Sequence, residues 1–200
     1  MNKIRFKKIN EKKIIHKNFI ESLNNIRNYL DDDSKVKNLV NICKFIKMKL
    51  KKGGKIYFAG NGGSASDAIH LATELISKLS KKRAALPADT LVSNISVLTA
   101  ISNDYSYENV FSRQIEANLF KDDIFFGITT SGNSKNIINA LYTCKKNKLS
   151  SIILTGSNGG KASKISDFCI KVPSKRTQTI QELHILIGHC ICEILEESII

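Results

Sequence analysis

Residues 58–75 read FAGNGGSASDAIHLATEL and pass from an apolar strand through a glycine loop into a helix. Glycines allow close backbone approach and positive φ angles, and the N-terminus of the following helix offers unpaired N–H groups and partial positive charge. A corner of this kind typically holds a phosphate group. The helix behind it also carries His70 and Glu74, which indicates that the segment does more than bind phosphate.

Further strands alternate with helices along the chain. We expect strands at 55–60, 122–129, 151–157 and 168–173, a strand at the start of 90–100, and a final helix from about Gln178 to Glu197. This alternation predicts an α/β fold with a mostly parallel sheet that helices flank on both faces. No linker interrupts the pattern, so we predict a single domain over residues 1–200.

Residues 1–52 are predicted to form an N-terminal helical hairpin packed on that domain. Apolar residues step by three and four along the first helix, which places them on one stripe. The DDDS segment (31–34) interrupts it, and Asp33 or Ser34 is expected to cap the second helix. The two stripes comprise Phe19, Leu23, Ile26 and Leu30, then Val36, Leu39, Val40, Cys43, Ile46 and Leu50.

The composition is that of a soluble globular protein, with 42% apolar and 24% charged residues among 200. No apolar run is long enough to span a bilayer, and the basic first residues lack the apolar core of a secretory signal. We therefore expect a cytoplasmic protein with no membrane partner. The five cysteines form no CxxC pair, which favours reduced core thiols over a disulfide framework.

The formal net charge is +13. Lysines are spread along the chain, without an arginine cluster, interleaved aromatic residues or a zinc-finger signature, so we predict no nucleic-acid partner. The charge favours anionic substrates more generally.

The strand–glycine–helix corner recurs in TTSGNS (129–134) and TGSNGG (155–160). None of the three corners matches a P-loop or a dinucleotide-binding fingerprint. Any one of them taken alone could be a tight turn, but TTSGNS places four hydroxyls at a helix start, and we predict that it is the main phosphate cradle.

His70 and Glu74 are four residues apart and share one helix face. On the last helix, Gln181 and His189 are eight residues apart, close to two turns. Two imidazoles, a carboxylate and an amide oxygen could form a zinc site, or the same groups could act as general acid and base. His70 and Glu74 could instead be a surface pair, and His189 alone could be a hydrogen-bonded core histidine. These alternatives stay open at this point. His184 lies on another side of the helix and receives no role.

In combination these segments resemble the phosphoheptose isomerases of the sugar-isomerase (SIS) fold group. The similarity covers nearly the whole chain and rests on GNGGSASDAIHLATEL, AISNDYSYENVFSRQIEA, GITTSGNS, LTGSNGG and TIQELHILIGH, in this order. It implies isomerisation of sedoheptulose 7-phosphate to D-glycero-D-manno-heptose 7-phosphate, the first step of nucleotide-activated heptose synthesis for lipopolysaccharide or capsule. It also implies a homotetramer with one zinc per subunit.

The resemblance implies roles for individual residues as well. Glu74 and His189 would serve as base and acid, and zinc as the Lewis acid that supports oxyanion charge. The zinc ligands would be His70, Glu74, Gln181 and His189. The substrate would contact Asn61, Gly62, Gly63, Glu74, Asn103, Asp104, Thr129, Thr130, Ser131, Ser134 and Gln181.

Three positions depart from the family's common pattern, namely Lys78, Asn94 and Thr179. They bear on the fine specificity for the sugar more than on the reaction type. Two alternatives are an SIS isomerase for another phosphosugar and a non-catalytic SIS regulator that binds the replication-initiator protein. The regulator has no physical reason to keep the four proposed zinc ligands together.

Overall fold

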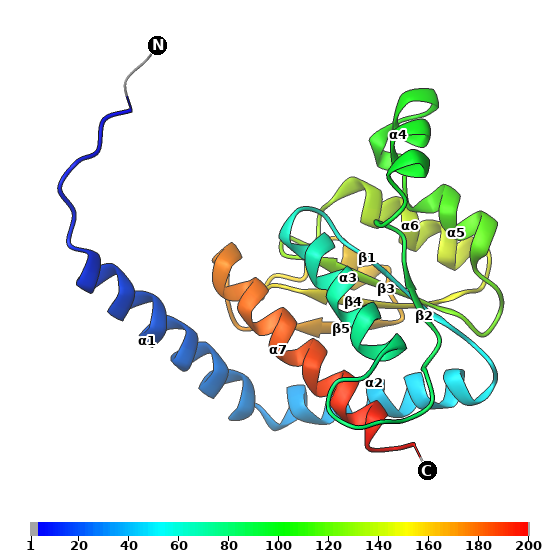
Figure 1. Ribbon diagram of the computed structural model, residues 1–200, viewed down its shortest axis with the longest axis horizontal. Helices are drawn as coiled ribbons and strands as arrows, with labels where there is room; N and C mark the ends of the chain where they lie inside the picture. Colours follow the sequence, from blue (N-terminus) through cyan, green and yellow to red (C-terminus); the bar gives the residue numbers. More distant parts are fainter. Residues whose placement is uncertain (1–3, 200) are drawn as a thin grey trace.

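A computed structural model describes residues 4–199 of the chain (Figure 1). It begins with helices α1 (Glu11–Leu30) and α2 (Asp33–Lys51). The expected cap of α2 at Asp33 or Ser34 is wrong by one residue. Asp32 is extended, and its carboxylate accepts hydrogen bonds from the backbone N–H groups of Ser34 and Lys35, the second and third helical residues.

The predicted alternation of strands and helices is confirmed. The segment 90–100 departs from expectation because its strand ends at Thr90 and most of it is helical, with Asn94 accepting a hydrogen bond from the Val97 N–H as the helix cap. The remaining elements are β1 (Ile56–Ala59), α3 (Gly63–Ile76), β2 (Ala88–Thr90), α4 (Ile95–Asp104), η1 (Tyr107–Asn109), α5 (Ser112–Asn118), β3 (Ile124–Thr129), α6 (Lys135–Lys146), β4 (Ser150–Thr155), η2 (Ala162–Lys164), β5 (Phe168–Lys171) and α7 (Thr177–Glu196).

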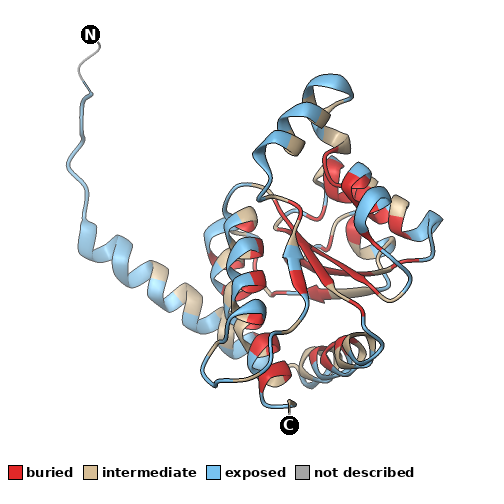
Figure 2. Cartoon of the chain, turned by 45° about the vertical axis from the view of Figure 1, so that its right-hand side comes forward, coloured by how far each residue is buried: buried red, intermediate tan, exposed pale blue. Residues whose placement is uncertain are grey.

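The five strands form one sheet in the order β2-β1-β3-β4-β5, and every neighbouring pair is parallel. Alternate strand residues face opposite sides. Phe58, Phe126 and Leu154 pack with α2, α3 and α7, whereas Phe125 and Ile153 pack with α5 and α6. Figure 2 shows the buried residues concentrated on the strands and on the helix faces turned toward them. Both faces of the sheet are therefore covered, as predicted.

The first half of α1 stands away from the domain (Figure 1). Tyr29 is its only buried residue within the described part of the chain. Phe19 and Leu23 of the expected stripe are 69% and 59% exposed. These apolar side chains have no cover from the chain itself.

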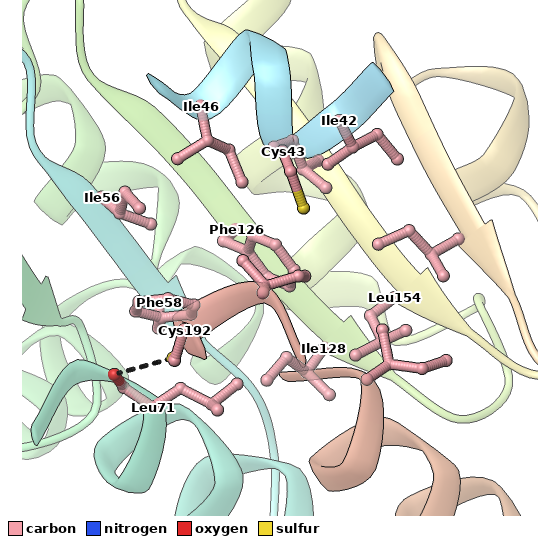
Figure 3. Close-up of a cluster of buried hydrophobic side chains, with 14 of the residues drawn as sticks. Ile42, Cys43, Ile46, Ile56, Phe58, Leu71, Phe126, Ile128, Leu154 and Cys192 are labelled. Atoms are coloured by element: carbon pink, nitrogen blue, oxygen red, sulfur yellow. Dashed lines mark hydrogen bonds between the residues drawn. The ribbon is translucent and has the colours of Figure 1, made fainter. Parts of the chain in front are cut away.

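Helix α3 packs against α7 with the two helices running in the same direction. Gly63 meets Gln181 near the start of the pair, and Leu71 meets Gly188 further along. A Cβ atom on Gly188 would lie 2.5 Å from Leu71 Cδ2, so glycine allows the close approach. Cys192 Sγ lies 4.0 Å from the Leu71 carbonyl oxygen in the same seam (Figure 3).

We predict that Gly188→Ala lowers the free energy of unfolding by about 1–3 kcal/mol, because the added methyl group overpacks this seam. Leu71→Ala alone should cost about 2–5 kcal/mol by leaving a cavity. The added methyl group fills part of that cavity. The double variant should therefore lose less free energy of unfolding than the sum of the losses in the two single variants. Urea unfolding of all four proteins measures the difference. Additive effects would show that the two residues do not share the contact.

Candidate active site

The parallel packing of α3 and α7 brings together two histidines that are 119 residues apart in the chain. Nε2 of His70 lies 3.2 Å from Nε2 of His189 and 3.2 Å from Oε1 of Glu74. The His70 and Glu74 side chains are 48% and 20% exposed, so the cluster is open to solvent. Three of the residues predicted to act as acid, base or metal ligand are therefore in contact, with His70 between Glu74 and His189.

The spacing of these donors fits zinc. Zinc–nitrogen bonds of about 2.0–2.1 Å in a tetrahedral site separate neighbouring ligand atoms by roughly 3.3 Å, close to both observed distances. Within residues 4–199, however, no three His, Cys, Asp or Glu side chains form a complete metal-ligand cluster. The zinc site therefore stays a prediction, which the two pairwise spacings support.

Gln181 lies at the other end of the helix seam, beside the glycine loop. A Cβ atom on Gly63 would lie 2.4 Å from Gln181 Nε2 and 3.1 Å from its Oε1. Gly63 precedes His70 by seven residues, which is about two helical turns. Gln181 thus lies where the predicted substrate contacts Gly62 and Gly63 begin α3, and its role as a metal ligand stays a prediction.

The second and third glycine corners lie against each other at the carboxyl ends of β3 and β4. A Cβ atom on Gly132, whose φ is +67°, would lie 2.1 Å from the Gly159 carbonyl oxygen. The Gly156 N–H also donates to the carbonyl oxygen of Thr130 at 3.1 Å. The two corners therefore form one continuous surface at this edge of the sheet.

The hydroxyls of TTSGNS leave the start of α6 open. Ser134 is the N-cap residue, but its hydroxyl makes no capping bond and lies 3.1 Å from the Thr129 hydroxyl instead. Ser131 is exposed and accepts a hydrogen bond from the Asn133 N–H. Free N–H groups at a helix N-terminus beside hydroxyl donors suit a phosphate dianion.

Asn136 connects the first glycine corner to the second, and no sequence motif predicted this contact. Its buried amide exchanges two hydrogen bonds with Asn61, of 3.0 and 2.8 Å, and Tyr107 Oη donates to the same Asn61 oxygen at 2.8 Å. The available signal was weak: asparagine is a poor helix former, yet it lies in the first turn of α6.

Asp67 is a second residue beside the candidate site that no sequence motif predicted. It lies one turn before His70 on α3, and its Oδ2 atom is buried without a hydrogen-bond partner among the described residues. Burial raises the pKa of this carboxyl group, and the nearby His70 opposes the rise. The only sequence signal was its helical spacing of three from His70.

Asn103 and Asp104 are not brought to the histidine cluster by any contact within the described chain. They end α4, which buries none of its residues and projects from the domain (Figure 1). Asn103 Nδ2 donates to Asp104 Oδ1 at 2.9 Å. Their predicted contact with substrate therefore stays a prediction.

A surface hollow of about 510 Å³ does not coincide with this chemistry. It is lined by residues such as Ile115, Phe120 and Leu149, near the beginning of β3 and β4, and contains none of the candidate residues. The convergence of reactive side chains, and not the size of a hollow, locates the site.

The SIS-domain family model matches residues 18–156. A phosphoheptose isomerase of Aneurinibacillus thermoaerophilus is 54% identical over 149 residues, 74% of this chain and 75% of that protein. The one from Sulfurimonas denitrificans is 43% identical and spans 94% of this chain and 96% of its own. The solved phosphoheptose isomerase structure from Francisella tularensis superimposes with a TM-score of 0.90 at 30% identity, covering 95% of this chain and all of that one.

We predict that Ser134→Ala raises the KM for a phosphorylated substrate about tenfold and changes kcat by less than about twofold. The phosphate is held alike in ground and transition states, and a hydrogen bond to a charged group contributes about 1.5–3 kcal/mol. Ser131→Ala should behave in the same way. Ser96→Ala, an exposed serine in the first turn of α4, is the control. Steady-state kinetics decide, and a loss confined to kcat would place this loop in the proton transfer instead.

Proposed function

This chain belongs to the phosphoheptose isomerases of the SIS-domain family, and on that premise we propose how its residues carry out the reaction. It is an aldose–ketose isomerase that converts sedoheptulose 7-phosphate to D-glycero-D-manno-heptose 7-phosphate, the first step of nucleotide-activated heptose synthesis. The observation that carries this function is the contact of His70 with both Glu74 and His189. The non-catalytic regulator and the isomerase of another phosphosugar are not favoured by the comparisons.

The reaction moves a proton between C1 and C2 of the sugar through an enediol. In our proposal the Glu74 carboxylate takes the proton from C1 while His189 gives one to the C2 carbonyl oxygen. Glu74 then returns its proton to C2, and His189 recovers one from the C1 hydroxyl, which leaves the aldehyde. The proton balance closes, and both residues end in their starting states.

Binding at the far end of the sugar fixes the position of these carbons. The hydroxyls of Thr129, Ser131 and Ser134 and the open N-terminus of α6 suit the 7-phosphate group. The Asn61–Asn136 bonds hold the first corner beside the second. Holding the substrate at one end so that the reacting atoms meet their base supplies a large part of the rate enhancement in such sites.

We further propose that His70, Glu74, Gln181 and His189 hold one zinc ion per subunit. When bound, zinc would supply Lewis-acid stabilisation of the developing charge on the sugar oxygens. Two nitrogen and two oxygen donors suit zinc better than calcium or magnesium, which prefer oxygen ligands alone.

A homotetramer is the proposed assembly. Its support is the uncovered apolar surface on α1, where Phe19 and Leu23 are mostly exposed, and on α7, where Leu186 is 43% exposed.

None of the helices in the described part of the chain is long and apolar enough to cross a membrane. We place the enzyme in the cytoplasm and its product on the route to heptose units of lipopolysaccharide or capsule.

We predict that Glu74→Gln and His189→Ala each lower kcat for sedoheptulose 7-phosphate by at least about 10²-fold, the usual contribution of an acid or base group. Thr73→Ala is the matched control, because Thr73 is exposed on the same helix and bonds only the Ile69 carbonyl oxygen. Circular dichroism confirms the fold of each variant. Near-normal turnover in both catalytic variants would refute the mechanism.

We also predict a tetramer in solution that carries about one zinc per chain. Chelation should abolish activity and leave the tetramer mostly intact, because the exposed apolar side chains Phe19, Leu23 and Leu186 are not among the proposed ligands. Metal analysis and sedimentation before and after chelation measure both effects. A metal-free monomer with full activity would contradict both the assembly and the metal.

A further inference from the structure

The carboxylate of Glu196, in the last turn of α7, is buried and fully hydrogen-bonded. Its oxygens accept from the backbone N–H groups of Leu79, Ser80 and Lys81 at 2.8–2.9 Å and from the Ser80 hydroxyl at 2.8 Å. Arg83 Nε completes the set at 3.2 Å. One side chain of α7 therefore organises the segment that leaves α3.

Arg83 turns back from that segment to the end of α3. Its side chain is 4% exposed, and its guanidinium donates to the carbonyl oxygens of Glu74 (2.7 Å), Leu75 (2.8 Å) and Ala84 (3.0 Å). The last carbonyl groups of a helix have no partner inside it, and a cation is favoured there by the helix dipole. Arg83 thus caps α3 at the residue that we propose as the base.

These bonds tie the two helices that carry the reacting groups. Glu196 follows His189 by seven residues, about two turns along α7, and Arg83 holds the backbone of Glu74 itself. Apolar contacts such as Leu71 on Gly188 bring the helices together but are not directional. Charge-assisted hydrogen bonds have strict geometry, so they set the position of one helix along the other.

We propose that Glu196 and Arg83 are positioning residues for the isomerisation, which fix Glu74 relative to His189 across the α3–α7 seam. The inference rests on the proposed function of that site. Neither residue is among the predicted substrate contacts. A displacement of about 1 Å in a reacting group can cost about 10²-fold in rate.

Glu196, which forms a clamp with Arg83, keeps its carboxylate ionised throughout the working pH range. Burial alone would raise the pKa of Glu196, but the N–H groups of Lys81, Leu79 and Ser80 outweigh it and lower the pKa to about 2. Loss of the clamp should therefore lower kcat without changing the shape of its pH profile.

The test is the variant Arg83→Lys, which keeps the charge and removes the planar fork that reaches three carbonyl oxygens. We expect kcat to fall about 10- to 100-fold, with the KM and the affinity for inorganic phosphate within about twofold. The second and third glycine corners, where we propose that the phosphate binds, follow β3 and β4 and have no hydrogen bond to Arg83 or Glu196. Ser80→Ala removes one bond to Glu196 and should lower kcat about threefold, so a milder variant remains if Arg83→Lys folds poorly.

Asp122→Asn is the matched control. It breaks the partly buried Lys49–Asp122 ion pair of 3.2 Å, which ties α2 to the segment before β3. It should lower the melting temperature without lowering kcat. Unchanged kcat in folded Arg83→Lys, or parallel losses in kcat, phosphate affinity and melting temperature, would overturn the positioning role. Absence of wild-type turnover of sedoheptulose 7-phosphate would instead refute the proposed function.

Discussion

The close parallel packing of α3 on α7 is the constraint on which the site depends. Gly188 lets the helices approach until Leu71 fills the space that a side chain would occupy. The same seam holds Gln181 at the glycine corner and His189 beside His70. Each helix supplies half of the proposed acid–base pair, so neither could act without the other in register.

The phosphate-binding groups and the acid–base groups lie at two different places on the parallel sheet. The carboxyl ends of β3 and β4 carry the hydroxyls and glycines that suit a phosphate, whereas the helix seam on one face of the sheet carries the imidazoles and the carboxylate. The first glycine corner, between β1 and α3, contacts both places. Asn61 bonds Asn136 at the start of α6, on the phosphate side, and Gly63 lies against Gln181 in the α3–α7 seam. A substrate with a phosphate at one end and a reactive carbonyl at the other matches this division.

Sequence patterns predict local structure more readily than contacts between residues that are far apart in the chain. The strand–helix alternation and the His70–Glu74 pair follow from short periods, and both are confirmed as structure. The Arg83–Glu196 and Asn61–Asn136 contacts join residues 113 and 75 positions apart, which no local pattern reveals. Of the three departures from the family pattern, Asn94 caps α4, Thr179 donates to Glu21 and Lys78 is exposed. None of them is in contact with the histidine cluster.

Burial explains why one histidine of α7 and not the other suits the chemistry. His184 is fully buried, and neither ring nitrogen has a hydrogen-bond partner among the described residues. Burial lowers its pKa to about 4, so at neutral pH the ring is uncharged, and its buried position keeps it away from a substrate. His189 lies five residues later, half-buried and in contact with His70. The helix thus places one imidazole in the core, where it stays neutral, and the other at the open seam, where a sugar can reach it.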